Sequence, residues 1–520
     1  MKVIFPKGHL PILIIIFLLG LVVRSINFRE SVYFGYDEAR DAFVSQEIYT
    51  KGDLKLIGPQ ASAFSGIHHG PLYYYLIGPL FLLGKGDPYF VSVIFRIINT
   101  FGIVGVYVLG NLLFTPLVGL LSAFIYSVSY EQFIYAIFTG NPSISNVLWI
   151  VIFIGLGIIC KHKNRTKQGL LLMFLGAASI PQFDMIGGYS LFVLVILLFL
   201  IRDKLKNIGI KEWLLIVFIG LSPLYTYIIA EVKNKFLATK ILIGLITGGV
   251  SNVGSGDSMF LIFYRNILGL FKNNILDLKI GDWLITLLFI LLLTYLISKT
   301  RSERKYQFVL VWILSIAFLV VAHGFMPFYS YAGVGIGVII ASAIFIGDVY
   351  KKNRIVAYLL LGTIVCSNLI KVVEQSSKSL IVEIKAQPGM KLSDEIEIIK
   401  RTYKYSNGAP FTIRITSMPY RIQTVWAYLY TQYGKNIYGY YPYLETGNVY
   451  GFPGELPVPT SGTTCSRFLI REPIRGIPEN LIIKDVNEEN IFSDYLMEEK
   501  IGDFILQYRR AKDENCHPQG

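Results

Sequence analysis

The chain has 520 residues, of which 53% are hydrophobic and only 16% are charged, and its mean hydropathy is +0.53. Soluble domains carry about 25% charged residues, so this composition excludes a soluble globular protein and favours a membrane protein. The net charge is +13, and the four cysteines form no CxxC pair and no dense framework. The cysteine pattern argues against a zinc or iron–sulfur centre and against a disulfide-stapled secreted scaffold.

Apolar segments along the first 370 residues predict a polytopic α-helical membrane protein with about 11 transmembrane helices. The first segment, Leu10–Val23, follows Lys2 and Lys7, and no small-residue cleavage site comes after it. We therefore expect an uncleaved first span with a cytoplasmic N-terminus. The later segments are 88–112, 115–130, 143–160, 169–180, 187–201, 213–230, 283–298, 307–322, 331–347 and 355–370. Segments 169–180 and 187–201 are short for a span, which indicates a tilted or re-entrant hairpin.

Basic residues gather in the loops between these segments. The clusters are Lys161–Lys167, Arg202–Lys211, Lys299–Lys305 and Lys351–Arg354. With Lys2 and Lys7 they hold 17 basic residues, and only four acidic residues lie among or beside them, so they account for the whole excess of +13. Cytoplasmic loops of membrane proteins are rich in Lys and Arg. The charge therefore predicts which loops face the cytoplasm, and it is no evidence for nucleic-acid binding.

The same rule decides how to interpret the apolar segment Gly70–Leu83. If it crossed the membrane, every later basic cluster would lie outside. It is also short, and it contains Pro71, Pro79 and three tyrosines. We therefore expect it to lie in the outer interface. The loop 24–87 and the segment 372–520 are then both expected on the outer face.

The sequence predicts two domains. We expect residues 1–371 to form a transmembrane domain that includes the outer loop 24–87, and residues 372–520 to form a small soluble α/β domain on the extracytoplasmic side. The second domain alternates helix-like and strand-like patterns with turn-rich stretches. The expected helices are 393–405 and 421–433, the expected strands are 411–417, 467–471 and 504–509, and a turn-rich stretch covers 451–462.

An acidic cluster lies in the first outer loop, in the sequence YDEARD (residues 36–41), which continues in helical rhythm to Tyr49. On a helix Asp37 and Asp41 share a face, and Arg40 can reach Asp37 at i+3. Carboxylates clustered at a membrane surface serve as a general base, as metal ligands or simply as charges at the start of a helix.

Arg96 lies about two turns inside the second predicted span. An ionisable residue there must find a partner or an anion, and its alternative is to snorkel to the outer headgroups. Asn99 widens the same polar face. Other polar residues gather at outer ends of spans: Glu131, Asn141, Gln182, Asp184, Glu231, and His323 with Tyr329 and Tyr331.

This distribution separates an enzyme from a transporter. A transporter is expected to have ionisable groups or broken helices near the midplane, often with inverted repeats. Here the polar residues converge on one interface, as an enzyme acting on a membrane-bound substrate requires. His68 and His69 lie in the outer loop, but their spacing is wrong for a metal pair on one helix face.

Several motifs follow one another in a specific order. They are a short first span, YDEARD in the first outer loop, the interfacial HHGPLYYYLIGPLFLLG, GDPYFVSVIFR entering the next span, Gly140-Asn141-Pro142-Ser143, and Pro223 followed by Glu231. In this order they resemble the GT-C glycosyltransferases, in particular the family 39 branch with the protein O-mannosyltransferases and the lipid A aminoarabinose transferase. The resemblance covers residues 1–370, and 372–520 looks like the variable outer domain of such enzymes.

The resemblance implies a polyprenyl-phosphate-linked sugar donor, inversion at the anomeric carbon, and an acceptor that is a protein, a lipid or a glycan. It makes residues 1–371 the catalytic domain and places the active site in the outer loop 24–87, where Asp37 is the general base with Glu38 beside it. Arg96 and Lys85 are candidates for the donor phosphate, because a phosphate leaving group is stabilised by cationic side chains. The other expected substrate-binding residues are Asp41, Tyr74, Glu131, Asn141 and Glu231. No cofactor is assigned, and a divalent metal is not expected.

Two departures from the family pattern leave the acceptor and the metal dependence open. Many relatives have a second acid in the outer loop after the third span, where this chain offers Glu131 and Asn141. Relatives often have a histidine near the outer end of the fifth span, where this chain has Gln182-Phe183-Asp184. The alternative function is a transporter or flippase of lipid-linked sugars without transferase activity.

Overall fold

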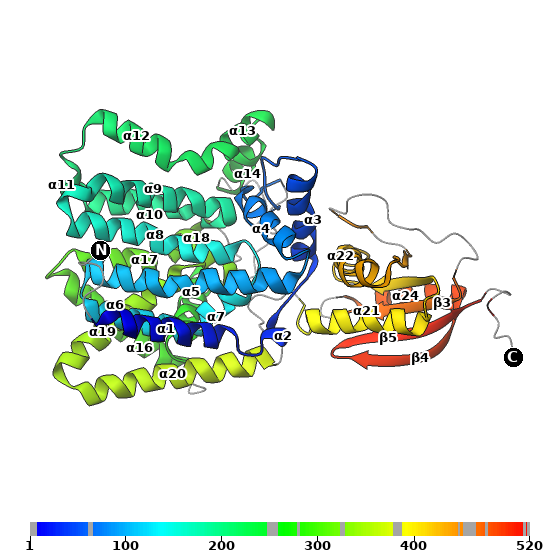
Figure 1. Ribbon diagram of the computed structural model, residues 1–520. Helices are drawn as coiled ribbons and strands as arrows, with labels where there is room; N and C mark the ends of the chain where they lie inside the picture. The colour runs from blue at the N-terminus through cyan, green and yellow to red at the C-terminus, as the bar shows by residue number, and fades with distance from the viewer. Residues whose placement is uncertain are drawn as a thin grey trace. The chain divides into compact units, whose positions relative to one another are not determined.

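The computed structural model describes residues 8–60, 66–246, 258–277, 281–322, 328–377, 387–445, 448–450, 464–473, 477–512 and 516. Helices dominate it, and a small sheet lies in its C-terminal part (Figure 1). The turn-rich stretch expected at 451–462 and the polar residue His323 lie outside the described residues.

The helices that precede the sheet range in length from 4 to 26 residues. The first ten are α1 His9–Arg24, α2 Phe28–Ser31, α3 Tyr36–Thr50, α4 Leu72–Leu83, α5 Pro88–Leu113, α6 Pro116–Val128, α7 Tyr130–Ile137, α8 Pro142–Lys161, α9 Thr166–Phe183 and α10 Ser190–Leu200. The next ten are α11 Arg202–Leu205, α12 Ile210–Gly220, α13 Tyr225–Lys233, α14 Leu237–Ile246, α15 Met259–Asn274, α16 Asp282–Thr300, α17 Lys305–Leu314, α18 Ile316–Ala322, α19 Val334–Lys352 and α20 Arg354–Ser377. The 3-10 turns are η1 Lys163–Arg165, η2 Met185–Tyr189, η3 Ser222–Leu224 and η4 Phe328–Tyr331.

Among these, α5, α8, α16, α19 and α20 are long and apolar enough to cross a membrane. Two bent pairs raise the number to seven if each is one span: α6 with α7, bent by 59°, and α12 with Ser222–Lys233, bent by 48°. Shorter apolar helices cover His9–Arg24, Leu72–Leu83, Met185–Leu200 and Lys305–Leu319. The chain is a multi-pass membrane protein, as predicted, and the total of about 11 spans stays a prediction.

Two predicted segments differ in detail from the helices. The segment 169–180 lies inside the 18-residue helix α9, because the polar residues Thr166–Gln168 extend the helix beyond its apolar stretch. The interfacial segment forms the 12-residue helix α4, with Pro79 inside it. Helix α4 approaches α3 closely, since a Cβ at Gly78 would lie 2.5 Å from the carbonyl oxygen of Ser45. Its place in the interface stays a prediction.

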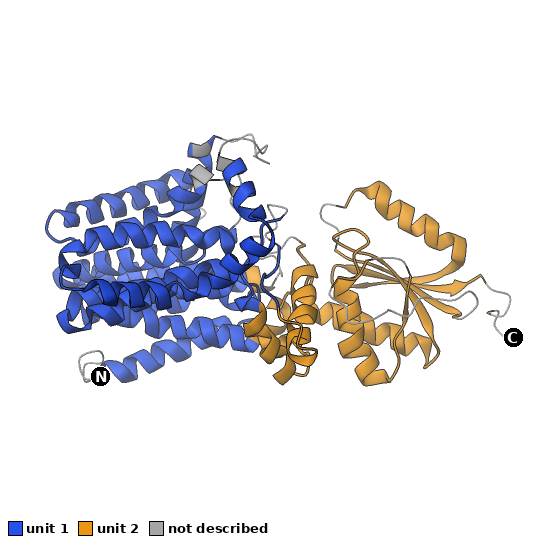
Figure 2. Cartoon of the chain, turned by 90° about the horizontal axis from the view of Figure 1, so that it is seen from above, with its two compact units in different colours: residues 1–26, 55–73, 93–374 blue, residues 27–54, 74–92, 375–520 orange. Residues whose placement is uncertain are grey.

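The chain divides into two compact units (Figure 2). The first comprises residues 1–26, 55–73 and 93–374, and the second comprises 27–54, 74–92 and 375–520. Much of the first outer loop therefore groups with the C-terminal residues. The predicted domains, 1–371 and 372–520, stay a prediction.

The C-terminal residues form a five-stranded sheet in the order β2-β1-β3-β5-β4. Strand β1 is parallel to β2 and β3, whereas β5 is antiparallel to β3 and β4. The strands are β1 Phe411–Thr416, β2 Tyr443–Leu444, β3 Ser466–Arg471, β4 Ser493–Ile501 and β5 Phe504–Ala511. The helices are α21 Leu392–Ser406, α22 Thr424–Leu429, the π-helical turn η5 Tyr430–Lys435, α23 Asn436–Tyr438 and α24 Glu479–Phe492. The predicted α/β character is confirmed, and a Cys465–Cys516 disulfide adds a cross-link.

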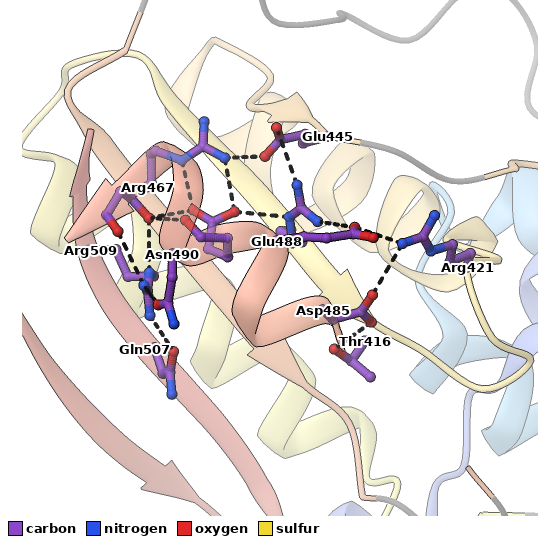
Figure 3. Close-up of polar contacts among 12 residues, drawn as sticks. Thr416, Arg421, Glu445, Arg467, Asp485, Glu488, Asn490, Gln507 and Arg509 are labelled. Carbon is purple, nitrogen blue, oxygen red and sulfur yellow. Dashed lines mark hydrogen bonds and ion pairs between the residues drawn. The ribbon is translucent and has the colours of Figure 1, made fainter. Parts of the chain in front are cut away.

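Helix α24 packs on this sheet through charges rather than through apolar side chains (Figure 3). Its Glu489 is fully buried and pairs with Arg414 at 2.9 Å and with Arg467 at 2.7 Å. Asp485, one helical turn earlier, accepts a hydrogen bond from Thr416 at 3.0 Å. The charges of α24 thus face the sheet, which is why its sequence lacks the apolar stripe of an ordinary core helix.

Candidate active site

The acidic cluster occupies the first turns of α3, which begins directly after Gly35. Glu38 is buried, and its Oε2 accepts a hydrogen bond from the backbone N–H of Gly35 at 3.1 Å. Asp37 and Glu38 both lie in the first turn, where negative charge interacts favourably with the helix dipole. The local sequence therefore accounts for both the start of the helix and the position of the cluster.

Arg40 connects the two aspartates of the cluster. Its Nη1 lies 2.7 Å from Oδ1 of Asp37 and its Nη2 lies 2.7 Å from Oδ1 of Asp41. The Asp37 side chain is 60% exposed, whereas the Asp41 side chain is only 5% exposed. The i, i+3 pair predicted from the sequence is confirmed, and Asp37 is the carboxylate that faces solvent.

Helix α4 adds a phenol to the same cluster. Tyr74 is buried, and its hydroxyl donates to Oδ1 of Asp41 at 3.4 Å. Asp37, Arg40, Asp41 and Tyr74 therefore form one continuous set of polar contacts within the second unit. The roles of Asp41 and Tyr74 in substrate binding stay predictions.

Burial raises the pKa of the two buried carboxyl groups of the cluster. Desolvation, aided by the charge of Asp37, raises the pKa of Glu38 to about 8. Desolvation raises the pKa of Asp41 to about 6, although the Arg40 guanidinium favours its charged form. Near pH 7 Glu38 is then mostly a neutral acid that cannot accept a proton. A proton acceptor in this cluster is best sought at the exposed Asp37.

Arg96 lies in the first unit, in α5, and its side chain is 2% exposed. Its Nη1 donates to the backbone carbonyl of Arg24 at the end of α1. Arg24 is itself fully buried, and it donates to the carbonyls of Gly20 and Ser127, each at 3.1 Å. The sequence had not pointed to Arg24, because an arginine directly after an apolar segment is typical of a solvated flanking charge.

A second buried polar group surrounds Glu131, at the bend between α6 and α7. Glu131 is fully buried, and its Oε2 accepts a hydrogen bond from Nδ2 of Asn274 at 2.7 Å. Ser129, which caps α7, donates to Oδ1 of the same asparagine at 2.8 Å. Glu131 is thus held inside the helix bundle of the first unit. Its expected role in substrate binding stays a prediction.

The three remaining predicted residues occupy helix ends and turns. Asn141 precedes α8 and donates to the carbonyl of Phe183 at the end of α9. Glu231 accepts hydrogen bonds from the backbone N–H groups of Ala238 and Thr239, so it caps the start of α14. Lys85 is exposed in the turn after α4, at a φ of 52°. Substrate binding by these residues stays a prediction.

Among the residues that the structure describes, no group of three or more His, Cys, Asp or Glu side chains could hold a metal ion. Nδ1 of His69 accepts a hydrogen bond from the backbone N–H of Met185 at 2.9 Å. Nδ1 of His68 lies 3.3 Å from the carbonyl oxygen of Gly58. The two rings therefore take part in the packing of the outer loop.

No protein-family model and no curated protein matches the sequence. Solved structures do match. ArnT from Cupriavidus metallidurans bound to undecaprenyl phosphate superposes with a TM-score of 0.61 at 10% identity, over 97% of this chain and 98% of that one. The apo state of the same protein superposes with a TM-score of 0.59 at 10% identity, over 96% of this chain and 98% of that one. The Archaeoglobus fulgidus oligosaccharyltransferase tethered to an acceptor peptide superposes with a TM-score of 0.49 at 13% identity, over 84% of this chain and 64% of that one.

The chain has the GT-C fold. This assignment rests on the two ArnT structures, which it matches over nearly their whole length. It confirms the resemblance that YDEARD and the following motifs indicated, because ArnT is the lipid A aminoarabinose transferase. At 10% identity the likeness is one of fold, so the chemistry has to be argued from the residues of this chain.

Proposed function

We propose that this chain is an integral-membrane inverting glycosyltransferase. It moves a sugar from a polyprenyl-phosphate-linked donor to an extracytoplasmic acceptor that is a protein, a lipid or a glycan. One observation carries the proposal: an exposed carboxylate, Asp37, is held by Arg40 beside two buried carboxyl groups in the first loop of a GT-C fold. ArnT, which shares the fold, binds undecaprenyl phosphate, and this supports a lipid-linked donor.

In this reaction Asp37 takes the proton of the acceptor hydroxyl or amine. The freed electron pair attacks the anomeric carbon of the donor sugar from the face opposite the phosphate. The bond between the anomeric carbon and the phosphate oxygen breaks, and polyprenyl phosphate leaves with the bonding pair. Arg40 holds the Asp37 carboxylate in one orientation, and a positioned general base contributes about 10²–10⁴ in rate.

The leaving phosphate needs cationic side chains rather than an acid. We assign this role to Lys85 and Arg96. The exposed position of Lys85 in the turn after α4 supports its assignment. Arg96 donates to the Arg24 carbonyl, which fixes its guanidinium within the bundle. Asp41, Tyr74, Glu131, Asn141 and Glu231 complete the proposed substrate-binding set.

We place the C-terminal residues and the acidic cluster on the extracytoplasmic side, with the N-terminus in the cytoplasm. The positive clusters in the loops support this orientation. The Cys465–Cys516 disulfide supports it independently, because disulfides persist in oxidising compartments and are rare in the cytosol. The acidic cluster belongs to the same compact unit as this disulfide.

The test uses purified chain in vesicles with a radiolabelled polyprenyl-phosphate sugar. The expected result is label transferred to an acceptor in a cell-envelope extract, with loss of transfer in Asp37→Asn. Movement of the intact donor across the vesicle membrane without transfer would identify a flippase instead and overturn the proposal. Mass spectrometry of cell-envelope glycans from a deletion strain would then identify the acceptor.

A further inference from the structure

A tyrosine from the C-terminal residues lies beside the acidic cluster. Tyr36 directly precedes Asp37, and the Arg40 guanidinium lies over the Tyr36 ring, 5.3 Å from its centroid. The ring of Tyr450 meets the Tyr36 ring with the centroids 6.2 Å apart and the planes at 83°. Tyr450 is therefore connected to Asp37 through three successive contacts, by way of Tyr36 and Arg40.

The backbone around Tyr450 is fixed to the start of α22. The backbone N–H of Tyr450 donates to Oγ1 of Thr424 at 3.0 Å. Two residues earlier, the carbonyl of Asn448 accepts from the N–H of Gln423 at 2.9 Å, and its N–H donates to the carbonyl of Arg421 at 2.9 Å. The ring of Tyr450 thus extends from a segment with defined hydrogen bonds.

Helix α22 is in turn packed against α3, the helix that carries Asp37. Tyr428 of α22 is buried, and its ring lies 4.9 Å from that of Phe43. Its hydroxyl accepts a hydrogen bond from Nε2 of Gln46 at 3.2 Å. All these residues belong to the second compact unit. The position of Tyr450 relative to Asp37 therefore follows from core packing.

The ring of Tyr450 has an accessible surface, since the residue is 47% exposed, whereas the Tyr36 ring already carries Arg40 and Tyr450. An exposed aromatic face next to carboxylates suits a pyranose ring. The C–H face of the sugar packs on the aromatic ring, and the carboxylates accept hydrogen bonds from its hydroxyl groups.

We propose that Tyr450 forms the wall of a sugar-binding subsite for the acceptor, next to Asp37. The inference rests on the proposed transferase function, because a general base must lie within hydrogen-bond reach of the acceptor proton. A ring beside the base therefore lies on the acceptor side. The C-terminal residues then contribute directly to acceptor recognition, and the favoured acceptor is a glycan or a glycosylated molecule.

The test measures sugar binding without requiring turnover. The full chain is placed in phospholipid nanodiscs, free of detergents with sugar headgroups, and probed by saturation-transfer difference NMR. The probes are the methyl glycosides of glucose, mannose, galactose and N-acetylglucosamine. Tyr450→Ala is compared with Tyr450→Phe, which keeps the ring, and with Tyr495→Ala, which removes a ring that is 55% exposed on β4.

At least one glycoside is expected to receive saturation from the wild type. Tyr450→Ala should weaken its binding by about tenfold, and Tyr450→Phe and Tyr495→Ala should leave it unchanged. The proposal is overturned if no glycoside binds or if Tyr450→Ala binds like the wild type. It is also overturned if Tyr495→Ala weakens glycoside binding as much as Tyr450→Ala does. Transfer of label from a polyprenyl-phosphate sugar to the bound glycoside is assayed separately. Binding without transfer would support the sugar wall while the transferase proposal fails.

Discussion

The protonation of Glu38 is the property of the acidic cluster that can be tested most directly. The pKa of this buried carboxyl rises from 4.5 to about 8 in the folded chain. Below pH 4.5 the folded and unfolded states both hold the proton, so Glu38 exerts no penalty. As the pH rises from 4.5 towards 8 the unfolded state releases the proton and the folded state keeps it, so stability falls.

The size of this effect follows from the two pKa values. One pKa unit corresponds to about 1.4 kcal/mol. The difference between the two pKa values therefore lowers the free energy of unfolding of the wild type by up to about 5 kcal/mol above pH 8. Glu38→Gln removes the ionisation and keeps an oxygen that can accept the hydrogen bond from Gly35 N–H. The variant should therefore match the wild type near pH 5 and exceed it by several kcal/mol at pH 9.

The assay is thermal unfolding in nanodiscs, followed by tryptophan fluorescence from pH 5 to pH 9. Glu47→Gln on the same helix is the control, because Glu47 forms a surface pair with Lys51 at 2.7 Å that is worth less than about 1 kcal/mol. Its curve should run parallel to that of the wild type. If the Glu38→Gln curve also ran parallel, Glu38 would be ionised in the folded chain. Glu38 could then accept a proton as well, and burial would no longer favour Asp37 over Glu38 as the base.

Three further predictions concern the base, the orientation and the C-terminal sheet. Asp37→Asn should lower transfer by about 10²–10⁴ and leave the Tm unchanged, because its side chain is 60% exposed; near-wild-type transfer would remove Asp37 from the mechanism. Asn480→Cys, in a chain with Cys160 and Cys366 replaced by Ser, should react with an impermeant thiol reagent in intact cells, and labelling only after lysis would reverse the orientation. Arg414→Met should destabilise the C-terminal sheet by about 3–5 kcal/mol in chemical unfolding, because it leaves Glu489 short of a partner. The control Arg421→Met, at a 36% exposed side chain, should cost less than about 1 kcal/mol, and equal losses would contradict the ionic docking of α24.

Local patterns in the sequence were enough to predict those helices, strands and ion pairs that depend on residues close together in the chain. The i, i+3 pair of Asp37 and Arg40 follows from helix geometry, and so does the amphipathic helix α21, predicted as 393–405 and found at Leu392–Ser406. The strand predicted at 411–417 is found at Phe411–Thr416, where apolar and polar residues alternate. In each case the periodicity of the side chains determines the element.

Contacts between distant residues could not be found in this way. Helix α24 was not predicted because its buried face is acidic, and that burial is favourable only with partners from elsewhere in the chain, among them Arg414 of β1 and Arg467 of β3. From the sequence, Arg24 resembles a charge that flanks a membrane span. In the structure it contacts residues of α5 and α6 and is buried. Tyr450 carries no motif, and its place beside Tyr36 depends on the packing of α22 against α3.

The acidic cluster depends both on local sequence spacing and on contacts between distant residues. Spacing alone puts Asp37, Glu38 and Asp41 on adjoining positions of one helix and treats them as equivalent carboxylates. Their environments make them different: Asp37 is exposed, Glu38 is buried against a backbone N–H, and Asp41 is buried against Arg40 and Tyr74. A general base has to be both ionised and accessible to the acceptor. Because burial holds Glu38 neutral and encloses Asp41, it supports the proposal, made first from the family resemblance, that Asp37 is the base.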